Sequence, residues 1–332
     1  MAAPTIISFT VGALLLFFVV SGFDINLATT WKGVRASNPI LYLIALVAYY
    51  CTFPLRGLRW QILLSNAGVT EDAALPSTWA ASRLILLGWM VSAISWFRMG
   101  DAYRAYAYGQ ESGAPLVRTL GTVIAERFLD LATIFILIIA AFLLLYLDAE
   151  RQPSRIFLYV AIGLVVGAGL LLLVLQITRD GIVKILPGGL RKIYYNFYAG
   201  MMGSFQRIPM VTIWGLLGWV AEVGRLYFLV QATGLDVGIG LIVFVTIANA
   251  VLSAVPLTPG GLGVAEPGIA GLLALQVPWD DAVTLAFLDR SISYLSVVLF
   301  GSIAFILHQR AARSVRETAR GAEGSPGVRK ET

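Results

Sequence analysis

The sequence predicts an all-α polytopic membrane protein with six full spans and two broken re-entrant hairpins, arranged as two inverted repeats. Its mean hydropathy of +0.81 is far too high for a soluble chain of 332 residues. Apolar windows of bilayer-spanning length, about twenty residues, recur along the chain. Among them, residues 253–273 carry three prolines, five glycines and one carboxylate, a composition that a continuous spanning helix would not have.

Six apolar windows are each long enough to span a bilayer. Two further apolar stretches are interrupted by Gly, Pro or charged residues, which predicts hairpins that enter and leave the membrane from one side. The first window lacks the basic region and the cleavage pattern of a signal peptide, so we expect it to be retained as a span. The predicted spans are 4–22, 40–60, 117–147, 156–177, 211–232 and 282–308, and the predicted hairpins are 77–108 and 238–276.

Basic residues near the span ends predict the orientation, because Lys and Arg are enriched in cytoplasmic loops. The arginine-rich tail, residues 309–332, is expected to be disordered and cytoplasmic, and the basic loop 178–209 is expected on the same side. The short turns around Asp236 and around Asp280 and Asp281 have no basic residue and should lie outside. Counting back places the amino terminus inside as well, in a multi-pass protein of the plasma membrane. Only Lys32 and Arg35, in the first external loop, oppose this assignment.

Part of the cytoplasmic loop, residues 182–205, mixes basic residues with tyrosines, phenylalanines and Met201. This composition predicts a helix that lies in the membrane interface. The alternative is a tilted extension of the following span. Residues 1–308 as a whole are expected to form a single integral-membrane domain.

The prolines and glycines near residue 260 are expected to break a helix inside or near the bilayer. Proline removes a backbone donor, and glycine removes side-chain packing. Irregular backbone at that depth is tolerated only where protein buries it or water reaches it. A polar cavity is therefore predicted at the break, with Glu266 as the carboxylate near a freed helix end. The breaking residues are Pro256, Pro259, Gly260, Gly261 and Gly263.

The two halves of the chain match weakly but consistently, over about residues 40–147 and 211–308. Glu126-Arg127 in the first half aligns with Asp289-Arg290 in the second. Each half consists of a span, a broken hairpin and a span, and the predicted orientation makes the halves inverted. Inverted hairpins that meet near mid-membrane form a site that opens to either face, which predicts transport. Chance similarity between apolar helices is the alternative.

Charged residues inside the predicted spans and hairpins are candidate site residues. A charge at a helix centre costs about 2.5–3.5 kcal/mol on insertion scales, so such charges usually face a cavity or one another. Arginine suits an anionic ligand, because its guanidinium stays charged and matches phosphate bidentately. Mutual neutralisation is the alternative for each cluster, and membrane-surface anchoring is the alternative for Arg56 and Arg59. The candidates for substrate binding are Arg59, Arg104, Arg127, Arg225, Arg290, Glu126, Asp130, Glu222, Glu266 and Asp289.

Four motifs follow one another along the chain: RGLRW at 56–60, WFRMGD at 96–101 with Arg104, ERFLD at 126–130, and PLTPGGLGV at 256–264 with Glu266. Together they resemble the lysylphosphatidylglycerol synthetase transmembrane-region family, which includes the flippase half of the bacterial multiple peptide resistance factor. The resemblance covers about residues 40–308. It implies a flippase-like fold with re-entrant helices that handles phospholipids or related lipids.

Two features of this chain bear on the function that the resemblance implies. Family members commonly have a basic residue before the glutamate of the last motif, where this chain has Ala265, which leaves the lipid headgroup open. The soluble aminoacyl-transferring domain is absent from this polypeptide, so lysine transfer onto lipid is not expected from it.

The favoured hypothesis is a flippase for a phosphate-bearing lipid: a phospholipid, an aminoacyl-phospholipid or a polyprenyl-phosphate-linked lipid. The alternative is an accessory subunit of a lipid-linked glycosyl or aminoacyl transferase, or such an enzyme itself, with Glu266 or Asp101 as the base. A single cysteine, Cys51, and a single histidine, His308, exclude a disulfide framework, a zinc cluster and Cys/His catalysis within the chain. No cofactor, metal or nucleic-acid partner is expected. A membrane enzyme partner and a homo-oligomer are left open.

Overall fold

The computed structural model describes residues 27–71, 73–95, 99–147, 187–254 and 258–323, with isolated positions between 159 and 177, and it describes side chains as far as residue 310. The predicted span at 4–22 and most of that at 156–177 lie outside these residues, as does Pro256. The described chain is helical. Its elements are α2 (Leu27–Ala36), α3 (Pro39–Asn66), η1 (Val69–Glu71), α4 (Thr78–Ile94), α5 (Gly100–Ser112), α6 (Leu116–Leu147), α8 (Gly188–Gly203), α9 (Ile208–Thr233), α10 (Ile239–Ala254), η3 (Pro259–Gly261), α11 (Ala265–Leu273), α12 (Trp279–Arg290), the π-helical turn η4 (Ser291–Ser296) and α13 (Val297–Glu323).

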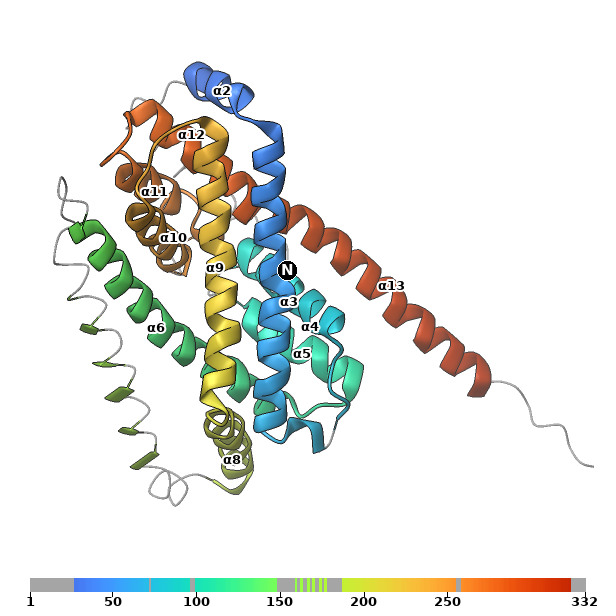
Figure 1. Ribbon diagram of the computed structural model, residues 1–332. Helices are drawn as coiled ribbons and strands as arrows, with labels where there is room; N and C mark the ends of the chain where they lie inside the picture. The colour runs from blue at the N-terminus through green and yellow to red at the C-terminus, as the bar shows by residue number, and fades with distance from the viewer. Residues whose placement is uncertain are drawn as a thin grey trace, which may run out of the picture.

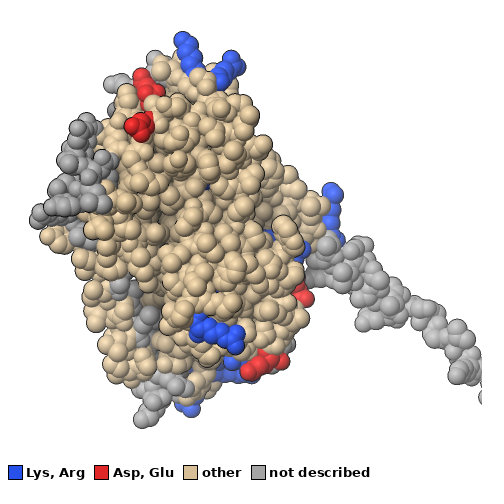
Figure 2. Space-filling view, in the orientation of Figure 1, with Lys and Arg blue, Asp and Glu red and all other residues tan. Residues whose placement is uncertain are grey.

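In the described chain, four helical stretches are long and apolar enough to cross a membrane. They are Pro39–Asn66, Leu116–Leu144, Ile208–Thr233 and Trp279–Arg310, and they match four of the predicted spans. The last joins α12, η4 and α13. Figure 2 shows the consequence on one face of the molecule, where charged side chains gather toward its ends and a broad band between them is almost free of charge.

Helices α3 and α9 run antiparallel at the centre of the fold (Figure 1). The backbone N–H of Asn38, before α3, donates to the carbonyl of Ala232 at the end of α9, at 2.7 Å. At the opposite ends, the Asn66 side-chain amide donates to the carbonyl of Gln206 at 2.6 Å. The Asn38 side chain also caps α3 by accepting the N–H groups of Ile40 and Leu41.

Glycines on α9 create the space that α3 needs. A Cβ atom at Gly215 would lie 3.0 Å from the Arg59 guanidinium, and one at Gly218 would lie 3.6 Å from the Arg56 side chain. Two long cationic side chains of α3 can therefore lie against the α9 backbone. Close packing of this kind between helices is what small residues permit in membrane proteins.

Each predicted hairpin consists of two short helices, α4 with α5 and α10 with α11, rather than one continuous helix. In the second hairpin, Gly260, Gly261 and Gly263 have φ values of 59°, 73° and 77°, in the left-handed region that glycine adopts at least cost. The predicted helix break is therefore present in the described backbone. In the first hairpin, Gly88 of α4 and Gly100 of α5 lie in backbone contact, where any larger residue would collide.

The ends of the two hairpins meet. The hydroxyl of Tyr294, in η4, donates to the carbonyl of Ala93 near the end of α4, at 3.2 Å. A Cβ atom at Gly260 would lie 2.5 Å from the Tyr294 ring and 3.3 Å from the Cα atom of Ala93. The end of α4 and the break at Gly260 are thus neighbours, with the Tyr294 ring beside them.

The predicted interfacial helix corresponds to α8, which packs against α6. Gly200 of α8 and Gly121 of α6 allow their backbones to touch, while Leu190 and Ile193 remain exposed. Its position in the membrane interface stays a prediction. At the other end of the chain, α13 continues to Glu323, so the backbone is helical over much of the predicted disordered tail, residues 309–332.

Candidate functional site

A cavity of about 610 Å³ lies between the two halves of the chain, where the hairpin ends meet. This volume is within the range of small-molecule sites, about 300–1,000 Å³. Both halves contribute to its wall. The polar lining includes Arg56, Asp101, Arg127, Asp130, Glu222, Arg225, Asn249, Ser253 and Arg290, and the aromatic lining is Tyr49, Trp89, Trp219 and Tyr294.

A cluster of buried ion pairs supports the wall in the first half. The Arg59 guanidinium on α3 donates to Asp130 at 2.6 Å and to the carbonyl of Glu126 at 3.0 Å. Arg104 on α5 donates to the Glu126 carboxylate at 2.6 Å and lies 4.6 Å from the centroid of the Trp60 ring. These pairs bind α3 and α5 to α6, with every bond directed at one segment of α6.

Arg127 closes this cluster toward the cavity. Its guanidinium binds both oxygens of Asp101, at 3.0 and 2.6 Å, in a bidentate pair. Such charge-assisted, two-point pairs are among the stronger hydrogen-bond arrangements in proteins. Asp101 stands in the first turn of α5, where the positive end of the helix dipole favours a carboxylate.

A second cluster supports the wall in the other half. Arg225 on α9 is in direct contact with the carboxylate of Asp289, and it also donates to the Asp289 carbonyl at 3.4 Å. The other oxygen of that carboxylate accepts from the amide of Asn249 at 2.9 Å. Arg225 thus holds α9 against α12, and Asn249 brings in α10.

Arg290 holds the broken hairpin. Its guanidinium donates to Glu266 at 2.8 Å and to the carbonyl of Gly260 at 2.7 Å, with a longer contact to the Ser253 hydroxyl at 3.3 Å. Glu266 also accepts the backbone N–H of Gly263 at 2.7 Å. Glu266 stands in the first turn of α11, where the helix dipole favours its charge. One arginine therefore satisfies both a carboxylate and a freed backbone carbonyl at the break.

The two clusters repeat the same contacts. In each half, an arginine of the first long helix donates to the main-chain carbonyl of an acidic residue, Arg59 to Glu126 and Arg225 to Asp289. The next residue in each case is an arginine that binds the carboxylate in the first turn of the hairpin's second helix. These pairs are Arg127 with Asp101 and Arg290 with Glu266. The sequence alignment of Glu126-Arg127 with Asp289-Arg290 therefore matches equivalent contacts.

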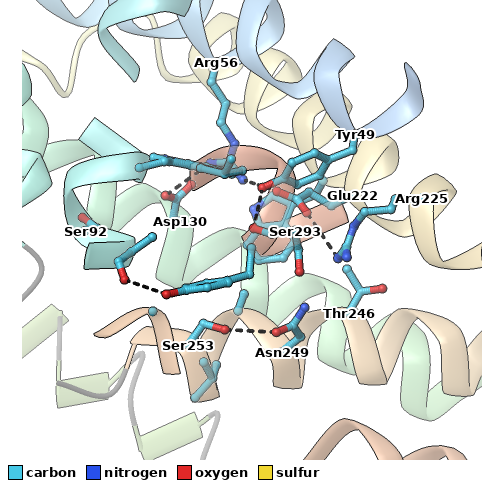
Figure 3. A pocket seen from close by; sticks show the side chains of 18 of the residues that line it. Tyr49, Arg56, Ser92, Asp130, Glu222, Arg225, Thr246, Asn249, Ser253 and Ser293 are labelled. Carbon is cyan, nitrogen blue, oxygen red and sulfur yellow. Dashed lines mark hydrogen bonds and ion pairs between the residues drawn. The ribbon is translucent and has the colours of Figure 1, made fainter. Parts of the chain in front are cut away.

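Arg56 and Glu222 differ from the other charges of the cavity. Arg56 is only 6% exposed, yet none of its nitrogen atoms makes a hydrogen bond among the described residues. Its nearest carboxylates, Asp130 and Glu222, lie 3.8 and 3.7 Å away. Glu222 likewise has only long ion pairs, the second to Arg225 at 3.6 Å. Figure 3 shows Arg56 reaching from α3 toward these groups.

Formal charges around the cavity balance. Within the described residues, the ion pairs of the cavity and its wall join equal numbers of cations and anions. They are Arg56, Arg59, Arg104, Arg127, Arg225 and Arg290 with Asp101, Glu126, Asp130, Glu222, Glu266 and Asp289. Four arginines and three carboxylates line the cavity, and the ion pairs behind it add two arginines and three carboxylates, so this described set as a whole has no surplus of either sign.

The structure separates the predicted site residues into two groups. Arg127, Arg225, Arg290, Asp130 and Glu222 line the cavity, as does Gly260 of the helix break. The other predicted charges stand behind this lining, in ion pairs that hold it. They are Arg59, Arg104, Glu126, Glu266 and Asp289.

Some cavity residues were not predicted as substrate-binding. Asn249 is an amide in the very apolar helix α10, and that isolated polarity was a usable signal. Tyr49, Trp89 and Trp219 carried no such signal, because aromatic side chains are common throughout the spans. For Arg56 the sequence leaves anchoring at the membrane surface open as an alternative, but its side chain is buried and lines the cavity.

Comparison with known proteins places these features in a family context. A family model described as the lysylphosphatidylglycerol synthase TM region matches residues 5–301. A UPF0104 membrane protein of Methanocaldococcus jannaschii is 31% identical over 217 residues, which cover 64% of this chain and 92% of that protein. A UPF0104 membrane protein of Methanothermobacter thermautotrophicus is 25% identical over 317 residues, covering 86% of this chain and 91% of its own.

One relative carries an enzyme name. Glycosyltransferase AglD of Haloferax volcanii is 24% identical over 317 residues, covering 82% of this chain but 49% of its own length. About half of that protein therefore has no counterpart in the match. No solved structure matches the chain significantly.

Proposed function

The chain belongs to the lysylphosphatidylglycerol synthase transmembrane-region family, and on that basis we propose that it is a lipid flippase. It is a helical, multi-pass membrane protein. The proposed cargo is a phosphate-bearing lipid whose headgroup passes through the central cavity while its tails remain in the bilayer. The cavity opens alternately to the two leaflets.

The observation that carries this proposal is a single cavity lined by both broken hairpins, with charged groups from each half. An apolar membrane core gives a lipid headgroup no polar partners, so a route across needs a polar cavity at that depth. Gly260 and Ser253 come from the second hairpin, and Ser92 and Asp101 from the first. A cargo in the cavity would contact both halves at once.

The arrangement of the halves supports alternating access. Helices α3 and α9, which begin the two proposed repeats, run in opposite directions, as inverted repeats require. We propose that the clusters around Arg59 and Arg225 keep each half rigid. Contacts across the hairpin ends, such as Tyr294 with Ala93, are the ones that a rocking motion would break and remake.

Arg127 and Arg290 are the proposed switch between the wall and the cargo. Each faces the cavity and holds a carboxylate that sits at a helix start. Guanidinium groups can transfer their donors from a carboxylate to a phosphate, because both groups accept two parallel bonds from the planar guanidinium fork. The carboxylates keep the arginines in position when no lipid is bound.

Lipid retention tests the proposal. The purified full-length protein would be analysed by native mass spectrometry and lipid extraction, beside Arg127→Ala, Arg290→Ala and the peripheral control Arg83→Ala. We expect selective retention of one phosphate-bearing lipid by the wild type and the control, and its loss from the two cavity variants. Equal retention of bulk lipid by all four proteins would contradict the proposal.

The Haloferax relative gives a second candidate function. Its name as a glycosyltransferase and its unmatched half favour the hypothesis that a chain of this type serves a lipid-linked glycosyltransferase, as an accessory subunit or as the membrane half of an enzyme. Co-purification of a stoichiometric membrane enzyme, or product formation by the pure protein in detergent, would favour this alternative over transport.

A further inference from the structure

We propose that Arg56 and Glu222 form the headgroup-binding pair of the cavity, and that the cargo is a net-neutral lipid with one phosphodiester and one primary ammonium group. This inference rests on the proposed flippase function and narrows its substrate class. Arg56 would bind the phosphodiester, and Glu222 would bind the ammonium.

The first argument is unused hydrogen-bonding capacity. Every other charged group of the cavity and its wall takes part in at least one hydrogen bond, whereas Arg56 and Glu222 have only ion pairs of 3.6–3.8 Å among the described residues. The Nε atoms of Arg59, Arg104 and Arg225 are buried without a partner as well, but those arginines bond through their other nitrogens, and among the described residues Arg56 does not. Buried donors and acceptors without partners are costly, so such groups call for a ligand or water.

The second argument is that Arg56 is held in place without carboxylate hydrogen bonds. Its guanidinium lies 5.2 Å from the Trp89 ring centroid and 5.7 Å from that of Trp219, both within cation–π range. The two rings come from two different helices, α4 and α9. They orient the guanidinium while leaving its N–H groups available in the cavity.

The third argument is charge balance. Among the described residues, the ion-paired cations and anions of the cavity and its wall are equal in number, so an anionic headgroup would bring an uncompensated charge into a largely apolar cavity. Burial of an unpaired charge is strongly unfavourable. A zwitterion avoids this cost, because its two charges leave the total unchanged. Headgroups with two or more phosphate charges are disfavoured most.

The fourth argument is the spacing and chemistry of the pair. Arg56 Nη2 and the Glu222 carboxylate are 3.7 Å apart, too far for a hydrogen bond. A zwitterion beside them replaces this long pair with two short, charge-assisted bonds. Glu222 needs an N–H donor, which a primary ammonium has and a quaternary ammonium lacks. The neighbouring Trp rings, which would suit a quaternary group, are already occupied by Arg56.

Short-chain lipids allow a direct test of binding. The purified protein in detergent would be titrated calorimetrically with dioctanoyl-phosphatidylethanolamine, -phosphatidylcholine and -phosphatidylglycerol at one pH and salt concentration. We expect the wild type to bind the ethanolamine lipid at least about tenfold more tightly than either other lipid, since a charge-assisted hydrogen bond distinguishes them. Glycerophosphoethanolamine, which has the headgroup without tails, is expected not to displace the lipid at equal concentration.

Variants separate the two roles. Glu222→Gln should lose about tenfold in affinity for the ethanolamine lipid and bind the glycerol lipid as well as or better than the wild type, so the preference disappears or reverses. Glu222→Asp should retain the preference. Arg56→Gln should weaken binding of all three lipids, whereas Arg83→Gln, in a peripheral ion pair with Glu111, should change none.

Failure of this inference is distinguishable from failure of the flippase function. Wild-type preference for the glycerol lipid, or an unchanged preference in a folded Glu222→Gln protein, would overturn the assignment of headgroup and pair while leaving phospholipid transport intact. Displacement of the lipid by an equal concentration of glycerophosphoethanolamine would show that tails contribute nothing, which overturns a lipid cargo. Binding of none of the three lipids by the folded wild type would remove both proposals.

Discussion

At the scale of single residues, Arg290 shows how one side chain serves both fold and function. Three of its contacts lie in the broken hairpin, to Glu266, Gly260 and Ser253. The sequence predicted that this arginine and Glu266 belong to one site. The prediction rested on the alignment of Asp289-Arg290 with Glu126-Arg127 and on the position of Glu266 just after the helix break. It could not predict their direct pairing, because the partner of a charge depends on how helices distant in sequence pack together.

We expect Arg290→Gln to destabilise the protein by about 3–5 kcal/mol, because it leaves Glu266 buried without its partner. The double variant Arg290→Gln with Glu266→Gln should recover part of this loss, since no unpaired charge remains. Thermal unfolding in detergent would measure both. Arg83→Gln is the control, with an expected loss of about 0–1 kcal/mol for a partly exposed pair. Equal melting temperatures for Arg290→Gln and the control would contradict the structural role of the buried pair.

At the scale of elements, the helix break and the long spans were predictable because their signals are local. Proline and glycine cluster around residue 260, and the apolar windows have the length of a bilayer. The π-helical turn Ser291–Ser296 had no such signal. Side chains of α3 bond to this turn: the hydroxyls of Tyr42 and Tyr50 pair with those of Ser291 and Ser296. A turn stabilised by a distant helix cannot be predicted from its own residues.

The left-handed backbone of the break gives a prediction at this scale. We expect Gly261→Ala to destabilise the protein by about 1–2 kcal/mol, because L-residues are strained at its φ of 73° and the new Cβ would lie 2.7 Å from the Ser253 Cα atom. Gly271→Ala is the matched control on α11, with nothing within 4 Å of the new methyl group, and should be neutral or stabilising. Chemical or thermal unfolding would compare the two, and equal stabilities would argue against a strained break.

At the scale of the whole molecule, the antiparallel α3 and α9 and the meeting of both hairpins at Tyr294 define the central cavity. The sequence alignment of the two halves anticipated matching contacts around Glu126-Arg127 and Asp289-Arg290. It did not reveal that Arg56 and Glu222 face each other, since neither belongs to the aligned pairs. That contact arises only when the two halves pack against one another.

The proposed orientation is testable by labelling. In a Cys51→Ser background, Asp280→Cys should react with a membrane-impermeant maleimide on intact cells, because the turn before α12 is assigned to the outside. Gln206→Cys, near the start of α9, should react only after permeabilisation. Both positions are exposed in the structure. Reaction of both on intact cells, or the reverse pattern, would contradict the assigned topology.

The most direct test of the central claim is lipid movement in proteoliposomes. An acyl-chain-labelled phosphatidylethanolamine would be placed in both leaflets, and dithionite would quench the accessible label. With the wild-type protein, we expect the inner-leaflet label to become accessible over time. With Arg127→Gln, we expect the label to stay protected as in protein-free vesicles, because Arg127 and its partner Asp101 line the cavity. If the inner-leaflet label stayed as protected in vesicles with the folded wild-type protein as in protein-free vesicles, the account would be contradicted.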